Sequence, residues 1–230
     1  MVQQSAPPGI WDEDPDGASI LLATGRARHD LLVIAEPAFL RDLDQAWGRP
    51  SARVRLSFLP GVEAPSAPGH EDALVSYERG GLGVLVARGR TSVYEGEAAR
   101  SATALARIAS GARLRAALLI TRATPLHGSG DMAGGRSGDA APGQVRVVAD
   151  HLNLSGASPF AGTVFVDVRG VWDPELAGVL SALTRRAGTY AMVRGPEYQT
   201  MAETRILAGL GVDCVGMSTV MEALTLHALG

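Results

Sequence analysis

Two strand-to-helix turns near the end of the chain carry residues that could bind a small ligand. The first is Gly195-Pro196-Glu197-Tyr198-Gln199-Thr200, and the second is Gly216-Met217-Ser218-Thr219. Ser218 falls between a predicted strand end and a predicted helix N-terminus, where free backbone N–H groups and the helix dipole favour an anion. The same pattern also fits an ordinary αβαβ unit that binds nothing, so both interpretations stand at this point.

The helices that follow these turns carry local start and stop signals. Thr200 is followed three residues later by Glu203, and Thr219 by Glu222, so each pair fits a capping box. Gly211 is placed to end the first helix, because glycine readily adopts the left-handed conformation found after a helix C-terminus.

The composition predicts one α/β domain with a substantial core. The chain has 230 residues, 46% of them hydrophobic, and a net charge of −3, which suggests neither nucleic acid nor an anionic membrane as a partner. All 21 basic residues are arginines, which removes Schiff-base lysine chemistry and the phosphate-binding lysine of a P-loop. Cys214, the single cysteine, is expected to be a core thiol. Because no transmembrane run or secretory signal is found, we expect a cytoplasmic protein.

Strands alternating with helices predict a single domain with a mixed central sheet flanked by helices. The expected strands are 31–35, 53–58, 73–76, 82–87, 116–121, 145–148, 190–193 and 213–217. The expected helices are 37–47, 98–109, 173–186 with Asp173 as N-cap, about 200–210, and one that begins at Thr219. Ligands of such sheets bind at the carboxyl ends of strands, so the turns after residues 35, 87, 121, 193 and 217 should lie near one another.

Two segments lack hydrophobic periodicity. Residues 1–18 are rich in Pro, Asp and Gln and are predicted to be disordered, which leaves 19–230 as the domain. Residues 125–143 are rich in Gly, Asp and Ser and are predicted to form a mobile loop.

Several motifs occur in a fixed order along the chain. They are Pro68-Gly69-His70, Gly89-Arg90 with Tyr94-Glu95-Gly96, Asp150-His151-Leu152-Asn153-Leu154 with Ser158-Pro159, Phe165-Val166-Asp167, the turn at 195–200, and Val215-Gly216-Met217-Ser218-Thr219-Val220. Together they closely resemble the trimeric purine nucleoside phosphorylases, above all the actinobacterial members. The resemblance covers residues 68–230 well and 30–60 weakly, and it implies the fold of that family. Its members cleave inosine or guanosine with phosphate, giving the free base and ribose 1-phosphate.

The resemblance implies roles for individual residues. Arg90 matches the phosphate arginine, Ser218 the phosphate serine, and His70 a histidine of the phosphate and ribose region, where we expect a catalytic role. The ribose and base side is implied to include Tyr94, Tyr190, Tyr198 stacked on the purine, and Met217 under the ribose. For each of these residues, the alternative is that it serves only to pack the core and does not contact a ligand. This alternative is strongest for Tyr190 and Met217 and weakest for Arg90.

Other positions depart from the family pattern. Gln199 replaces the purine-reading glutamate, and its NH₂ group would meet donors on the base at a cost of roughly 1–3 kcal/mol. Ser92 replaces a histidine on the phosphate side, and Arg122-Ala123 replaces Asn-Ala on the ribose side. We still expect these four residues to line the site, with Gln199 at the catalytic base-reading position.

The phosphate loop is also replaced. The Gly-Ser-Gly of the family is Ala35-Glu36-Pro37 here, which removes a hydroxyl and flexible amides and adds a carboxylate that repels phosphate. Glu36 and Arg122 should lie at adjacent strand ends, so we expect an ion pair with less than about 6 Å between the charged groups to fill the vacated phosphate site. The family continues past the position of Gly230 with a further strand, a histidine-bearing segment and a long helix, which we expect to be missing here.

These departures predict a purine nucleoside phosphorylase-like protein that binds a purine-like nucleoside or base, with phosphorolysis lost or strongly weakened. One alternative is an active pentosyltransferase or hydrolase with altered base preference. Another is a non-catalytic oligomerisation partner, whose open sheet edge would pair with a second chain. The resemblance implies a homotrimer, and we expect no metal or other cofactor, with phosphate as co-substrate if the protein is active.

Overall fold

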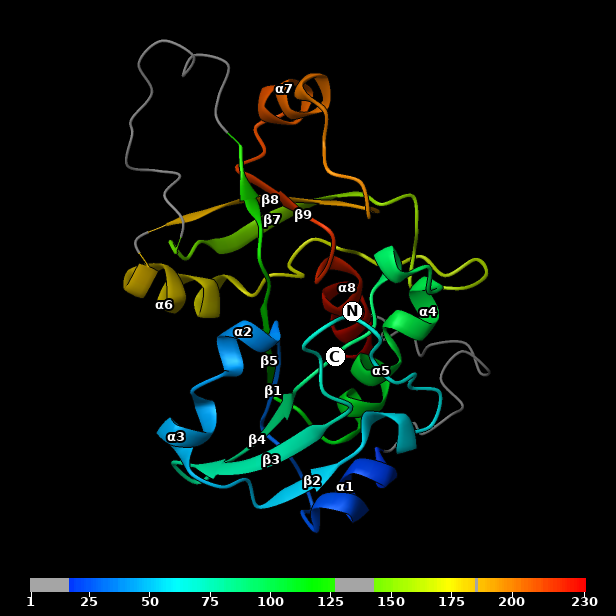
Figure 1. Cartoon of the computed structure of the whole chain (residues 1–230), viewed down its shortest axis with the longest axis vertical. Helices are drawn as coiled ribbons and strands as arrows, with labels where there is room; N and C mark the ends of the chain where they lie inside the picture. The colour runs from blue at the N-terminus through cyan, green and yellow to red at the C-terminus, as the bar shows by residue number, and fades with distance from the viewer. Residues whose placement is uncertain (1–16, 127–142, 185) are drawn as a thin grey trace.

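The computed structural model describes residues 17–126, 143–184 and 186–230 of the chain. Its strands form two sheets rather than the single central sheet that was expected, while the mixed α/β class is confirmed (Figure 1). The five-stranded sheet has the order β2-β3-β4-β1-β5 and is built from β1 (Leu31–Ala35), β2 (Ala52–Val54), β3 (Leu74–Arg79), β4 (Leu82–Ala87) and β5 (Ala116–Ile120). The four-stranded sheet has the order β6-β9-β8-β7 and is built from β6 (Thr124–Pro125), β7 (Val147–Leu154), β8 (Ala187–Val193) and β9 (Cys214–Gly216).

The first sheet carries three of the five predicted site turns, those after residues 35, 87 and 121, because three of its strands run in the same direction. β1 is parallel to both β4 and β5, with Leu32 opposite Leu85 on one side and Ala117 on the other. The residues that follow these three strands therefore meet at one edge of the sheet, as predicted. The chain passes from β5 directly to β6, which joins this edge to the second sheet.

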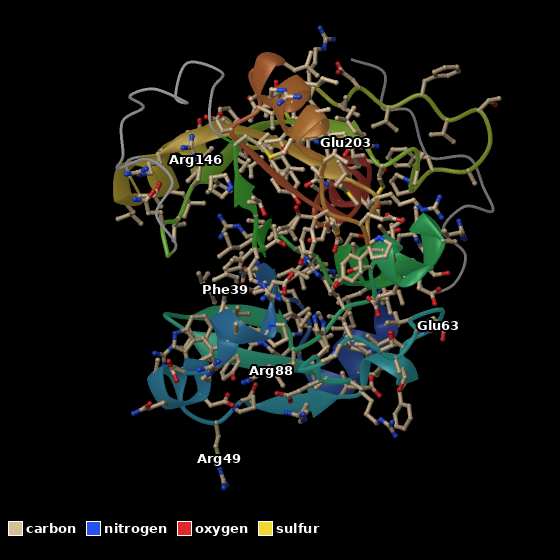
Figure 2. All side chains as sticks on the ribbon, turned by 45° about the horizontal axis from the view of Figure 1, so that its top comes forward. Phe39, Arg49, Glu63, Arg88, Arg146 and Glu203 are labelled. Atoms are coloured by element: carbon tan, nitrogen blue, oxygen red, sulfur yellow. The ribbon has the colours of Figure 1, made fainter. Side chains whose placement is uncertain are left out.

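Helices cover both sheets and fill the space between them. They are α1 (Ala18–Thr24), α2 (Pro37–Leu40), α3 (Leu43–Trp47), α4 (Ala99–Ala102), α5 (Ala104–Gly111), α6 (Pro174–Thr184), α7 (Met201–Gly209) and α8 (Val220–Leu229), with 3₁₀ turns at Leu56–Phe58 and Val93–Glu95. In Figure 1, α8 and α5 lie between the lower, five-stranded sheet and the upper, four-stranded one. Figure 2 shows side chains filling this space, with Arg88 belonging to the lower part and Arg146 to the upper.

Two expected helices are interrupted. The helix expected over 37–47 is divided into α2 and α3, and the one expected over 98–109 into α4 and α5. At the second break, the Thr103 hydroxyl donates to the carbonyl of Ala99 at 2.8 Å, and Thr103 itself has φ −107° and ψ 7°. A threonine hydroxyl that bonds the backbone in this way competes with the regular helical pattern.

The strand expected over 53–58 is wrong beyond Val54. Asp72 accepts hydrogen bonds from the backbone N–H and the hydroxyl of Ser57, at 2.8 and 2.6 Å. These bonds hold a 3₁₀ turn that buries Leu56 in the core. A side chain 15 positions away thus overrides the local alternation that indicated a strand.

The helix signals of the sequence are confirmed at three ends and wrong at one. The Thr200 capping box is present, Gly211 has φ 81° after α7, and Asp173 accepts from the N–H groups of Glu175 and Leu176. The second capping box does not form. Thr219 has φ 76°, and its hydroxyl donates to the carbonyl of Ser218 instead of accepting from the helix.

Two large apolar clusters support the site. The cluster of the first sheet includes Ile20, Leu32, Leu85 and Ile108, and the cluster of the second sheet includes Tyr190, Met192, Cys214, Met221 and Leu224. Cys214 is buried as expected, and burial raises the pKa of its thiol to about 11. Within the described part of the chain, every helix is too short or too polar to cross a membrane.

The predictions for residues 1–18 and 125–143 fall mostly outside the described residues. Of the first segment, Gly17 and Ala18 are described, and Ala18 begins α1. Of the second, Pro125 belongs to β6, and Leu126 and Gly143 are also described.

Candidate functional site

A buried arginine is the centre of the charged cluster at the sheet edge. Arg90 follows β4, and only 3% of its side chain is exposed. Its Nη2 donates to Ser218 Oγ at 2.7 Å, to Glu36 Oε1 at 3.0 Å and to Thr121 Oγ1 at 3.3 Å. The cluster therefore joins the ends of β1, β4 and β5 to the turn that precedes α8.

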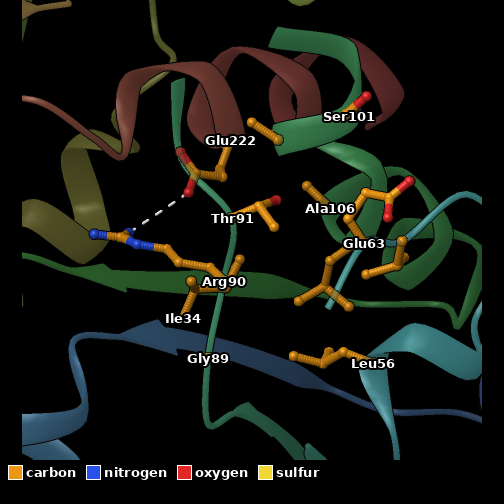
Figure 3. A pocket seen from close by; sticks show the side chains of 12 residues that line it. Ile34, Leu56, Glu63, Gly89, Arg90, Thr91, Ser101, Ala106 and Glu222 are labelled. Carbon is orange, nitrogen blue, oxygen red and sulfur yellow. Dashed lines mark hydrogen bonds and ion pairs between the residues drawn. The ribbon is translucent and has the colours of Figure 1, made fainter. Parts of the chain in front are cut away.

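A second acid contacts the other terminal nitrogen of the same guanidinium. Glu222 Oε1 lies 3.5 Å from Arg90 Nη1, and 8% of the Glu222 side chain is exposed (Figure 3). The spacing of Thr219 and Glu222 predicts a capping box and gives no indication of this contact. A usable signal was present, since Glu222 is the one acidic residue in the sequence of α8, whose other first-turn residues are apolar.

The predicted ion pair between Glu36 and Arg122 is confirmed. Arg122 Nη2 lies 3.1 Å from Glu36 Oε2, well inside the expected 6 Å. The side chain of Arg122 is 76% exposed, whereas that of Glu36 is 10% exposed. Glu36 therefore places one carboxylate oxygen on the buried Arg90 and the other on the exposed Arg122. Together with Glu222, the cluster contains two carboxylates and two guanidinium groups, whose charges balance.

Thr121 is a further member of the cluster and is not among the predicted site residues. Its hydroxyl lies 2.8 Å from Ser218 Oγ and 3.4 Å from Glu36 Oε1. A threonine at the end of an apolar strand carries no distinctive signal, because the contact depends on how β5 sits beside β1. The hydroxyl connects Glu36, Arg90 and Ser218 in one network.

His70 contacts this network through the backbone rather than through its charged groups. His70 Nδ1 accepts from the backbone N–H of Arg90 at 3.1 Å. Burial lowers the pKa of His70 below its ordinary value; to a smaller extent, the negative charge of Glu36 raises it and the positive charge of Arg90 lowers it further. A neutral imidazole is the form that accepts this hydrogen bond, so the contact and the lowered pKa agree.

Tyr190 is buried in the second core cluster and holds the Ser218 turn. Its hydroxyl donates to the carbonyl of Ser218 at 3.0 Å and accepts from the N–H of Ser218 at 3.4 Å. Burial raises the pKa of Tyr190 to about 12. The structure thus gives Tyr190 a positioning role, while its expected contact with ribose stays a prediction.

The two turns that the sequence singled out lie against each other. A Cβ placed on Gly195 would overlap the Met217 sulfur, so the Met217 side chain packs directly on this glycine. Tyr198 on the first turn is 84% exposed, and Gln199 is half-buried. In the described parts of the chain, no hydrogen bond or ion pair joins Tyr94, Ala123, Tyr198 or Gln199 to the Arg90 cluster, and their ligand roles stay predictions.

Two small cavities adjoin the cluster. One, of about 10 Å³, is lined by Arg90 and Glu222 together with apolar residues such as Ile34, Leu56 and Leu105 (Figure 3). The other, also of about 10 Å³, is lined by Ser92, Met217, Ser218 and Glu222 among others. Each offers roughly the space of one water molecule.

Comparison with known proteins agrees with this fold and these motifs. Residues 131–230 match the model of the phosphorylase superfamily. The purine nucleoside phosphorylase of Mycobacterium leprae is 37% identical over 209 residues, which cover 90% of this chain and 74% of that protein. The purine nucleoside phosphorylase of Cellulomonas sp. is 32% identical over 225 residues, which cover 92% of this chain and 73% of that protein.

The chain belongs to the purine nucleoside phosphorylase family. A solved structure of isoform 2 of purine nucleoside phosphorylase from Schistosoma mansoni, in complex with cytosine and ribose-1-phosphate, has the same fold with a TM-score of 0.77. The identity to it is 20%, and the match covers 94% of this chain and 78% of that chain. The family resemblance expected from the motifs is therefore confirmed.

Proposed function

We propose that this protein binds a purine-like nucleoside or base and that its phosphorolysis is lost or strongly weakened. One observation carries the proposal. The carboxylate of Glu36 lies 3.0 Å from Nη2 of Arg90, the residue expected to hold phosphate. The protein's own carboxylate thus takes the contact that a phosphate oxygen would need.

The electrostatics of the cluster oppose a second anion. Arg90 and Arg122 are already balanced by Glu36 and Glu222, so the four side chains sum to zero charge. A phosphate bound to Arg90 would approach Glu36 closely, and two like unit charges 4 Å apart repel by about 4 kcal/mol at an effective dielectric constant of 20. A penalty of that size weakens binding about a thousandfold.

A neutral ligand does not meet this penalty. We assign the ribose and base side of the site to Tyr94, Ala123, Tyr190, Tyr198, Gln199 and Met217. We assign Ser92 and His70 to the phosphate side, next to the Arg90 cluster. At Gln199 an amide replaces the charge that would stabilise a departing purine, which further weakens catalysis by the family's route. The related enzymes named above support a purine nucleoside as the ligand class.

The proposal extends to assembly and location. We place the protein in the cytoplasm as a homotrimer, as in the family that it resembles, and we assign no metal or organic cofactor to it. Phosphate is the co-substrate only if some phosphorolysis survives.

The test is an assay with and without phosphate. Inosine, guanosine and adenosine are each incubated with the protein, and free base and ribose 1-phosphate are quantified, with an active family member in parallel. We expect nucleosides to raise the melting temperature while phosphate produces no ribose 1-phosphate. Phosphate-dependent turnover of roughly 1–10³ per second would overturn the proposal. If no nucleoside binds and another protein co-purifies tightly, the role of a non-catalytic oligomerisation partner is favoured instead.

A further inference from the structure

The cavity lined by Ser92, Met217, Ser218 and Glu222 has the polar groups and the size to bind one water molecule. Ser92 is 4% exposed, and its hydroxyl has no hydrogen-bond partner among the described residues. A buried hydroxyl left in this state costs about 1–3 kcal/mol, and a bound water would remove that cost. The volume of about 10 Å³ suits a single water and excludes a phosphate.

The two acids of the cluster differ in how fully their oxygens are used. Glu36 accepts from Arg90 and Thr121 on one oxygen and from Arg122 on the other. Among the described residues, the Glu222 carboxylate accepts one hydrogen bond, from Arg90 at 3.5 Å to Oε1, which is long for such a contact. A carboxylate can accept about four hydrogen bonds, so Glu222 retains the capacity to accept one from a water in the cavity that it lines.

We propose that this cavity holds the nucleophilic water of a nucleoside hydrolase reaction, with Glu222 as its general base. The inference rests on the proposed function because it requires a nucleoside to be bound beside Met217. The water oxygen forms a bond to the ribosyl C1′ and keeps one hydrogen, while its other proton goes to the Glu222 carboxylate. The C1′–N bond breaks with its electron pair passing to the base, which then takes the proton from Glu222.

Each neighbour of the water has a defined part in this step. Ser92 and Ser218 fix the position of the water by hydrogen bonding, and Arg90 holds the Glu222 carboxylate in place. The products are ribose and the free base, so the reaction needs no co-reactant besides water. Glu36 favours this route over phosphorolysis because it repels the competing phosphate nucleophile from Arg90.

The experiment measures base and reducing sugar released from inosine and guanosine in phosphate-free buffer. We expect equal amounts of base and ribose, at a rate that added phosphate does not raise. Glu222→Gln should lower kcat by roughly 10²–10⁴-fold with little change in KM, the range typical of lost general base catalysis. Glu175→Gln on the exposed start of α6 is the matched control and should leave the rate unchanged.

The outcomes separate the two proposals. A nucleoside that binds but is not cleaved overturns the hydrolase inference and leaves the proposed function standing, as does a Glu222→Gln variant with the full rate. Phosphate-dependent formation of ribose 1-phosphate overturns both. If Glu222→Gln does not fold, Ser92→Ala decides, because it lies outside the ion pairs. The inference requires this variant to lose about tenfold in kcat, and an unchanged rate overturns it.

Discussion

Glu36 and Arg90 stand 54 positions apart in the sequence, yet their charged groups lie 3.0 Å from each other at the edge of the five-stranded sheet. The contact follows from topology, because β1 and β4 pair in parallel and the residues after both strands emerge at the same edge. Both side chains are at least nine-tenths buried, so the pair is weakly screened by salt. The anion of this arginine is thus supplied by the chain itself.

Replacing Glu36 should open the arginine to an external anion. In Glu36→Ser, Arg90 keeps Glu222 but loses its closest anionic contact, and Arg122 loses its partner. We expect phosphate to bind this variant with a dissociation constant on the order of millimolar, and therefore to raise its melting temperature but not that of the wild type. The measurement is thermal unfolding in 0 to 50 mM phosphate. Glu175→Ser, which removes an exposed carboxylate, is the control. An identical phosphate response in all three proteins would contradict the assignment of Glu36 as the internal anion.

Arg90 should contribute strongly to folding because two buried acids depend on it. Arg90→Met leaves Glu36 and Glu222 without their buried partner, and breaking such a pair typically costs about 3–5 kcal/mol. Adding Glu222→Gln should recover part of this loss, with a coupling of about 0.5–3 kcal/mol, measured by urea denaturation. The control is Arg169→Met, which removes an exposed pair with Asp167 and should cost far less. Equal losses for the two single variants would show that the Arg90 cluster adds no stability.

The sequence was sufficient to predict the strands that build the site edge. The apolar runs at 31–35 and 82–87 became β1 and β4 with the expected bounds, since a buried strand is a local property of composition. The pair of Glu36 with Arg122 was also predictable, because both charges follow neighbouring strands and both depart from the family pattern. What local signals could not supply was the second partner of Glu36, the buried Arg90.

Glu222 shows why part of the site escaped prediction. Its spacing from Thr219 fits a capping box, and locally nothing contradicts that interpretation. The carboxylate instead contacts Arg90, 132 positions away, and Thr219 adopts a positive φ that removes its hydroxyl from the helix end. The division of the site between two sheets was likewise hidden, because it depends on which strands pair and not on where strands occur.

The hydroxyl of Tyr190 should matter for stability and for its dependence on pH. Tyr190→Phe removes both hydrogen bonds to the Ser218 backbone and should cost about 1–3 kcal/mol. Burial raises the pKa of Tyr190 from 10 to about 12, so the unfolded chain loses this proton first, and the contribution of Tyr190 is present below pH 10 and is lost between pH 10 and 12. Between pH 9 and 11.5, the free energy of unfolding measured by urea denaturation should decrease less for Tyr190→Phe than for the wild type. Tyr198→Phe, at an 84% exposed position, should match the wild type at both pH values, and equal decreases in all three would refute the role of Tyr190.

Restoring the charge of the base-reading residue should not by itself restore phosphorolysis. Gln199→Glu returns a carboxylate that accepts from the base, but Glu36 still occupies the anion contact of Arg90. We expect no phosphate-dependent ribose 1-phosphate from this single variant in the inosine assay. Gln144→Glu adds the same charge away from the predicted base site and is the matched control. Recovery of turnover in Gln199→Glu alone would mean that Glu36 does not block phosphate.

Because the two site turns are in contact, substitution of Gly195 by alanine should destabilise the fold more than the same substitution at another glycine of similar backbone geometry. Gly195 has φ 70° and Gly211 has φ 81°, so alanine is strained at both positions by about 1–2 kcal/mol. At Gly211 a Cβ meets nothing within 4 Å, whereas at Gly195 it overlaps the Met217 sulfur and must displace that side chain. We expect Gly195→Ala to cost about 1 kcal/mol more than Gly211→Ala in urea denaturation, near the lower limit for overpacking because the thioether can move. Met217→Ala should remove most of this difference by vacating the overlapped space. If the difference persists in the Met217→Ala background, the sensitivity of Gly195 arises from its backbone alone and not from the contact between the turns.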